Sequence, residues 1–412
     1  MPLSAPPRTN TQILWAKVGS LALVQGAIAL MWVIYNLYLV DLLIQAGLDQ
    51  ALATGLLIVE NLLAMVMEPL MGSLGDRLQQ QLGTRFPLIG LGAILAVGAF
   101  ISIPLAVVGG WALARSWVLP LLLVLWALTM TIFRSPAMSL LGRYAFGTRL
   151  PQAASILTLV GGVAGAMGPL ASTQILNWGP IVAFGLGSGV LLVATVVLRL
   201  AAPDSAVADE AQELDASISN ADVSLLALAM IFGAGVGVSL GFRSLMLLFS
   251  RVLNNQLPNS NASLVLGLIF VSLAVTAIPS GLLAVRLGNR RAMILGLAAL
   301  AFVCAAIAPV QQNIAAIALA IFFGSAFSLV SNGTIPFALS LVPTPKAGLG
   351  TGMFFSGGAA AASLFSTFAT ALRSLPLVVS VLLGLTALLV AGGCVAGAPR
   401  RSNVTLKAST KF

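Results

Sequence analysis

The chain has 412 residues, of which 59% are hydrophobic and only 8% are charged, and it carries a net charge of +9. With a mean hydropathy of +1.05, this composition excludes a soluble globular domain and indicates an integral membrane protein. The basic residues stand mainly in short loops between apolar stretches, so we interpret the positive charge as a topology signal and exclude nucleic acid as a partner.

Apolar stretches long enough to cross the roughly 30 Å hydrocarbon core recur about twelve times. The first is interpreted as a retained helix, because it is too long for a signal-peptide core and no small-residue cleavage site follows it. The sequence therefore predicts an all-α integral membrane fold of about twelve transmembrane helices. In chain order, the predicted spans are Val18–Val40, Leu52–Met71, Phe86–Val108, Trp117–Ala137, Ala153–Leu176, Ile181–Leu200, Val223–Phe249, Ser263–Val285, Ala292–Pro309, Ile314–Leu341, Gly348–Leu372 and Pro376–Ala396.

Basic residues are distributed unevenly between the two sides of the membrane if these spans alternate in direction. Most of the 20 Lys and Arg residues fall on the side of the termini, whereas Arg115, Arg251 and Arg373 fall on the other side. By the positive-inside rule, we expect a multi-pass protein with both termini in the cytoplasm, in a membrane such as the cell inner membrane.

An acidic stretch and a set of repeated positions divide the chain into halves. Residues 201–222 are rich in Asp and Glu and contain no basic residue, as expected of a cytoplasmic linker. We expect six-helix halves over 1–200 and 223–399, and a basic cytoplasmic tail over 400–412. The halves share matches in the same order, which indicates a pseudo-symmetric repeat typical of transporters. These matches pair Gly72 with Gly281, Arg77 with Arg286, Gly83 with Gly288, Arg85 with Arg290 and Pro136 with Pro336.

A glycine-rich turn is predicted after the second span. Its sequence, GSLGDR from Gly72 to Arg77, resembles the signature loop of the major facilitator superfamily. Glycines allow helices to approach closely, and Asp76 can sit near a helix N-terminus or a basic residue. We expect Gly72, Asp76, Arg77 and Arg85 to form a conformational latch, whereas the second half has Val285 in place of the aspartate.

A finer resemblance is to the cation-coupled symporters of the glycoside, pentoside and hexuronide family and to sucrose transporters. The family pattern is matched by EPLMG, which begins at Glu68, and by GTRFP, which begins at Gly83. The resemblance implies that Glu68 belongs to a cation site. However, Arg134 stands two residues before Pro136, where the family has an aspartate. A guanidinium has only donors, so this substitution argues against a sodium site.

Carboxylates inside the second span are the candidates for coupling, since the chain has no histidine. Glu68 and Arg134 lie at similar depths, and we expect them to form a buried charge pair. The pair either takes part in coupling or only ties the second helix to the fourth. Glu60, near the bilayer midplane, is either a reversible proton acceptor or a permanently protonated carboxyl bonded to a hydroxyl or carbonyl group.

A second pair of charges is expected near the external face. Asp41 ends the first span and Arg243 lies late in the seventh, so the two could bridge the halves as an external gate. The alternative is that each is solvated at its own helix end. Arg243 is also a candidate for binding a carboxylate or phosphate of the substrate.

Polar and aromatic side chains within the spans are the candidates for a substrate cavity, because amides and hydroxyls suit sugar-like ligands and aromatic rings stack on apolar faces. The same side chains are also expected in ordinary helix packing. The candidates are Tyr35, Asn36, Tyr38, Trp126, Thr129, Asn332 and Ser356.

Several kinds of chemistry are not expected. Cys304 and Cys394 fall in different spans and suggest neither a disulfide nor a metal site. There is no Walker A sequence and no catalytic constellation, so the chain is expected to be neither an ATPase nor any other enzyme and to need no cofactor.

These observations predict a secondary active transporter that works by alternating access and acts as a monomer in the lipid bilayer. Its substrate is expected to be a small molecule, sugar-like or anionic, and its coupling to use protons or exchange rather than sodium. The alternative is a non-transporting membrane assembly or pigment-delivery protein with the same fold.

Overall fold

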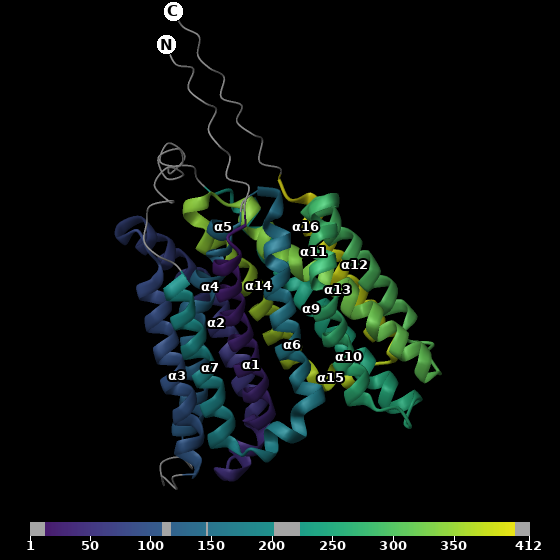
Figure 1. Cartoon of the computed structure of the whole chain (residues 1–412). Coiled ribbons are helices and arrows are strands. Elements are labelled where there is room, and N and C mark those ends of the chain that lie inside the picture. The colour runs from purple at the N-terminus through teal and green to yellow at the C-terminus, as the bar shows by residue number, and fades with distance from the viewer. Residues whose placement is uncertain (1–12, 109–116, 146, 202–222, 400–412) are drawn as a thin grey trace, which may run out of the picture.

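The computed structural model describes residues 13–108, 117–145, 147–201 and 223–399, which form a bundle of helices (Figure 1). Helices suit the bilayer because they satisfy every backbone donor and acceptor within one segment. They are α1 (Trp15–Gln45), α2 (Ala51–Leu82), α3 (Phe86–Val108), α4 (Val118–Ser139), α5 (Leu141–Tyr144), α6 (Leu150–Asn177), α7 (Pro180–Ala201), α9 (Leu225–Gln256), α10 (Ala262–Val275), α11 (Ala277–Leu287), α12 (Asn289–Ala306), α13 (Asn313–Leu341), α14 (Ala347–Thr367), α15 (Ala369–Ser374) and α16 (Leu377–Gly397), with the 3₁₀ turns η2 (Gly147–Arg149) and η3 (Thr344–Lys346).

The helices account for the twelve predicted spans. Within the described residues, 10 helices are long and apolar enough to cross a membrane, and the bent pair α10–α11 supplies an eleventh span. The remaining segment is α14, whose many Gly, Ala and Ser residues lower its hydropathy. The prediction of an all-α membrane fold is confirmed.

The second helix differs from its prediction, because the segment predicted as a turn is helical. α2 continues past Met71 to Leu82, so Gly72 and Asp76 lie within it. The chain turns at Gly83, whose φ of 70° ends the helix in the left-handed conformation that glycine adopts without strain. Hydropathy marks where a helix leaves the apolar layer, which is not where the helix itself ends.

The eighth span is also different, since Ser263–Val285 was predicted to be continuous. The structure breaks this span at Thr276, where α10 and α11 meet at 52°. Pro279 lies one turn beyond and has no N–H with which to bond the carbonyl of Val275, so the helical ladder is interrupted there.

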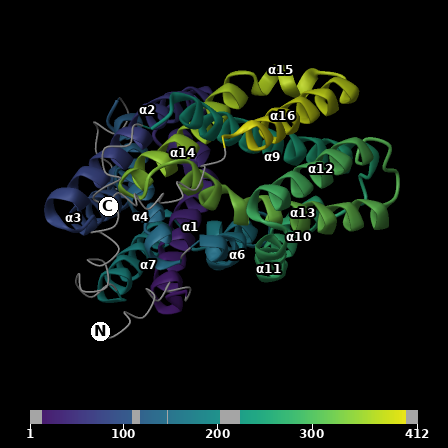
Figure 2. The same cartoon turned by 90° about the horizontal axis from the view of Figure 1, so that it is seen from above.

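Two hydrophobic cores, one in each half of the chain, organise the bundle. The first lies within residues 13–198 and contains Trp126 and Phe184. The second lies within residues 231–398 and contains Phe249 and Phe323. Viewed from above, α1, α3, α4 and α7 lie on one side of the molecule and α10, α12 and α13 on the other, while α14 of the second half lies beside α2 of the first (Figure 2). The linker predicted at 201–222 and the tail predicted at 400–412 lie outside the described residues, apart from Ala201 at the end of α7.

The halves meet along two seams: the first seam joins α2 to α14, and the second joins α6 to α10 and α11. At the first seam, a Cβ atom on Gly72 or Gly348 would collide with the carbonyl oxygen of the other residue. At the second, a Cβ on Gly281 would lie 3.0 Å from the carbonyl oxygen of Pro151. Glycine at the repeated position therefore lets helices from opposite halves approach closely at both seams.

Candidate functional site

The polar centre of the first seam is the carboxylate of Asp76. It accepts hydrogen bonds from the backbone N–H groups of Gly348 and Leu349, each at 2.8 Å. These two residues belong to the first turn of α14, where unpaired N–H groups and the helix dipole favour a negative charge. An acid in the first half thus caps a helix of the second half, at the end of the bundle predicted to be cytoplasmic.

Arg85 completes this arrangement from the loop between α2 and α3. Its guanidinium lies 2.6 Å from Oδ1 of Asp76 and also donates to the hydroxyl of Ser139. Burial lowers the pKa of Arg85, and the neighbouring Asp76 carboxylate opposes that shift. Arg77 is exposed. The structure therefore brings together Gly72, Asp76 and Arg85 of the predicted latch and leaves Arg77 outside it.

A second polar contact lies beside the latch on α4. The hydroxyl of Ser135 donates to the carbonyl of Gly348 at 3.0 Å and lies 3.2 Å from the hydroxyl of Thr351. Ser135 is fully buried and Thr351 almost so. These hydroxyls extend the polar contact between the halves from α2 to α4.

Deeper in the bundle, Glu68 of α2 and Arg134 of α4 form an ion pair. The Glu68 side chain is 0% exposed and that of Arg134 is 21% exposed. The guanidinium also lies 4.6 Å from the ring centroid of Phe355 on α14, a cation–π contact that crosses between the halves. The pair therefore joins α2, α4 and α14, while its role in coupling stays a prediction.

Glu60 is buried against α1 rather than exposed to a cavity. The hydroxyl of Tyr35 donates to Oε1 of Glu60, and Oε2 has no hydrogen-bond partner among the described residues. The Tyr35 ring packs on Trp126 with centroids 4.5 Å apart and on Trp32 with centroids 5.6 Å apart. This environment fits both alternatives for Glu60, a proton acceptor and a permanently protonated carboxyl.

Most predicted cavity side chains hold helices together in this conformation. Asn36 alone among them is exposed. The Tyr38 hydroxyl donates to the carbonyl of Ile175 at 2.7 Å, and the Asn332 amide to that of Ala277 at 2.8 Å. Their contact with a substrate stays a prediction. Ser356 of α14 donates to the Met65 carbonyl of α2, whereas the bond from Thr129 to the Trp126 carbonyl stays within α4.

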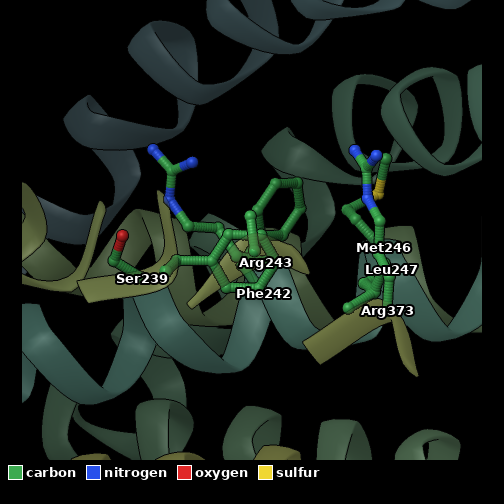
Figure 3. A pocket seen from close by; sticks show the side chains of 8 residues that line it. Ser239, Phe242, Arg243, Met246, Leu247 and Arg373 are labelled. Carbon is green, nitrogen blue, oxygen red and sulfur yellow. The ribbon is translucent and has the colours of Figure 1, made fainter. Parts of the chain in front are cut away.

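The external charges are not paired with each other. Asp41 is exposed near the end of α1, and no ion pair joins it to Arg243. Arg243 instead faces a cavity of about 420 Å³ (Figure 3), lined by Ser239, Phe242, Arg243, Met246, Leu247, Phe365, Ala369 and Arg373.

The sequence reasoning missed Arg373 as a site residue. Arg373 lies on α15, a short helix that follows α14 after a break at Phe368, and it lines the same cavity as Arg243 of α9. The signal available in the sequence was that both are basic residues near the predicted external face. Hydropathy could not show that they share a cavity, because it places Arg373 in a loop between two predicted spans and gives no information on which residues lie close together.

Comparison with known proteins agrees with this architecture. Residues 21–367 match the family model described as Major Facilitator Superfamily. The chain therefore belongs to the Major Facilitator Superfamily, and it is a multi-pass membrane transporter rather than an enzyme. None of the curated proteins compared with the chain matches it significantly.

A solved structure shares the fold. It is that of the proton:xylose symporter XylE bound to 6-bromo-6-deoxy-D-glucose, with a TM-score of 0.70 and 12% sequence identity. The alignment covers 93% of this chain and 96% of that one. At this identity the likeness establishes the arrangement of helices, and the earlier resemblance to the major facilitator superfamily is confirmed.

Proposed function

We propose that the protein is a secondary active transporter that moves a small solute by alternating access, driven by protons or by exchange. The observation that carries this proposal is the position of Glu60 and Glu68, two buried carboxylates on α2. The same helix carries Asp76 and forms the first seam. A change of charge on α2 would therefore act on the contact that holds the halves together.

Glu68 offers a physical route for this coupling. While it is ionised, it compensates the guanidinium of Arg134 beside Phe355 of α14. Protonation of Glu68 would leave that cation uncompensated at the junction of the two halves, where a buried unpaired charge is unfavourable. The conformation in which Arg134 reaches water or an anionic ligand would then gain population.

The resemblance of the segment that begins at Glu68 to the glycoside, pentoside and hexuronide symporters supports symport of a polar solute. XylE, which shares the fold, is a proton:xylose symporter. Both observations support a sugar-like substrate, whereas Arg243 supports an anionic one. Arg134 in place of an acid supports protons or exchange over sodium.

The proposal is tested with purified protein in proteoliposomes. A thermal-shift screen against sugars and organic anions first identifies a ligand, whose uptake is then driven by an inward proton gradient. Glu68→Gln and Glu60→Gln are expected to lose gradient-driven uptake while keeping counterflow exchange. Unchanged gradient-driven uptake in both variants would reject the coupling role of these carboxylates.

The external gate is tested separately. In the conformation closed to the outside, Asp41 and Arg243 would approach each other from opposite halves. A cysteine pair at positions 41 and 243, in a chain without Cys304 and Cys394, is expected to crosslink only in that conformation. A pair that never crosslinks during transport counts against the gate.

A non-transporting assembly or pigment-delivery role is the second candidate. It is favoured by the burial of Glu60 and Asn332 in helix contacts, since a transporter would use such polar side chains to line a cavity. Co-purification with a pigment complex, together with absent uptake and efflux in proteoliposomes, would decide for this role.

A further inference from the structure

We propose that the cavity between α9 and the α14–α15 segment is a binding site for an organic anion with an apolar, aromatic-sized body. The inference deepens the proposed transport function by assigning its substrate class. It depends on Arg243 and Arg373, on the apolar side chains between them and on the absence of acids from this half of the chain.

Two arginines of this cavity lack protein partners. No hydrogen bond or ion pair is found for Arg243 or Arg373 within the part of the chain that the structure describes, and both side chains are exposed to the cavity. The sequence contains no Asp or Glu after Asp222, so the second half has no acid to compensate them. An uncompensated guanidinium among apolar helices is costly, and an anion would remove that cost.

Arg251, another arginine on α9, has a structural role, because its guanidinium is bonded to neighbouring protein groups. Arg251 donates to the hydroxyl of Ser380 at 2.8 Å and to the carbonyl of Leu375 at 2.7 Å. These bonds tie α9 to the chain around the start of α16. Arg243, two helical turns earlier, makes no such contact, and its guanidinium projects from α9 to the same side as that of Arg373 (Figure 3).

The other side chains that line the cavity indicate the polarity and size of the part of the ligand that carries no charge. Phe242, Phe365, Met246 and Leu247 supply apolar surface. Phe242 is held in place by stacking on Phe327, with ring centroids 4.4 Å apart. A pocket of about 420 Å³ is within the usual range for small-molecule sites and has room for a bicyclic aromatic ring.

The arginines and the apolar lining select for the same molecule. Planar guanidinium groups favour carboxylate or phosphate, because they donate two parallel hydrogen bonds to these groups. The aromatic rings favour a flat apolar body over a polyol. The hydroxyl of Ser239 is already bonded to the carbonyl of Gly358, at 3.3 Å. Few other polar groups are left to recognise the hydroxyls of a sugar.

The test compares 2-naphthoate with 2-naphthamide, which has the same ring system without the charge. Binding to the full-length protein is measured by calorimetry in nanodiscs of phosphatidylcholine. Naphthoate is expected to bind at least about tenfold more tightly than naphthamide, which corresponds to about 1.4 kcal/mol. Arg243→Gln and Arg373→Gln are each expected to weaken naphthoate binding by about tenfold, and Arg251→Gln, the matched control on α9, to leave it unchanged.

Equal binding of naphthoate and naphthamide would overturn the proposal, as would an equal loss of affinity in Arg251→Gln and Arg243→Gln. If Arg243→Gln does not fold, Arg243→Lys keeps the charge without the planar fork. This variant is expected to bind naphthoate more weakly than the parent and still to prefer it over naphthamide. If neither the parent nor the folded lysine variant prefers naphthoate over naphthamide, the site is rejected.

The anion could be a soluble molecule or a lipid headgroup, and phosphatidylglycerol in the nanodiscs separates the two. Competition with naphthoate assigns the site to a lipid headgroup, and absence of competition assigns it to a soluble anion; both support an anion site. Naphthoate binding without its uptake or exchange by proteoliposomes would count against transport of this class of anion and leave the binding site standing.

Discussion

The two seams between the halves use the same steric device but differ in charge. Gly72 and Gly281, which correspond in the repeat, both allow close helix approach. At the first seam Asp76 binds the N-terminus of α14, whereas Val285 occupies the corresponding position on α11. Close packing is therefore common to both seams, while the polar contact that protonation or an anion could disturb belongs to the first.

The same contrast appears deeper in the two halves. Extending the repeat places Ala277 opposite Glu68 and Thr334 opposite Arg134. Where the first half has an ion pair, the second has a neutral hydrogen bond from the Asn332 amide to the Ala277 carbonyl. The buried carboxylates therefore gather in the first half, whereas the arginines of the cavity belong to the second.

The largest effect is expected from breaking the buried ion pair. Arg134→Ala leaves Glu68 without its cation and is expected to cost about 3 kcal/mol of stability, because a buried unpaired charge is strongly unfavourable. Thr334→Ala, the matched change in the other half, is expected to cost about 1 kcal/mol or less. Thermal unfolding in detergent measures both.

A double variant sharpens this prediction. Adding Glu68→Gln to Arg134→Ala removes the orphaned charge and is expected to restore most of the lost stability. A single Arg134→Ala variant as stable as Thr334→Ala would show that the pair contributes little.

The next effect tests the glycines that the seams share. Gly72→Ala and Gly281→Ala each place a methyl group against a backbone carbonyl of the opposite half, at an expected cost of about 1–3 kcal/mol. Gly55→Ala on α2 is the control, since its Cβ would enter open space. Alanine there is expected to be neutral or stabilising because it favours helix. Similar melting temperatures for all three would contradict close packing at the seams.

A smaller effect separates the seams by charge. Asp76→Asn keeps an acceptor but loses the charge, and it is expected to weaken the first seam by about 1.5 kcal/mol. The ratio of closed to open seam would fall about tenfold. The measurement is the alkylation rate of a cysteine introduced at position 135, in a chain without Cys304 and Cys394. This rate is expected to rise in Asp76→Asn because the seam opens more often. Val285→Ala is the control and should leave the rate unchanged.

The smallest effect is expected at the exposed end of the predicted latch. Arg77→Gln should change stability by less than about 0.5 kcal/mol, because the side chain is exposed and lies outside the Asp76–Arg85 pair. The alkylation rate at position 135 should also stay at the parent value. An alkylation rate as high as that of Asp76→Asn would show that Arg77 contributes to the latch.

Much of the fold could be predicted because hydropathy is a local property. Spans of about 20 apolar residues must be helical in lipid, so the helix order followed from the sequence. The failures at Gly83 and Thr276 have local causes as well. α2 continues past the apolar layer until a glycine ends it, and Pro279 breaks the eighth span.

The sequence by itself determined the membrane class, the helix order and the residue types at the latch, since hydropathy and expensive buried charges can be recognised along one chain. Only the tertiary structure decided which charges meet. It paired Asp76 with the N-terminus of α14, set Arg134 between Glu68 and Phe355, and brought Arg373 into the cavity of Arg243. These contacts join residues distant in sequence or cross between the halves, and they depend on helix rotation and close approach, which hydropathy does not encode.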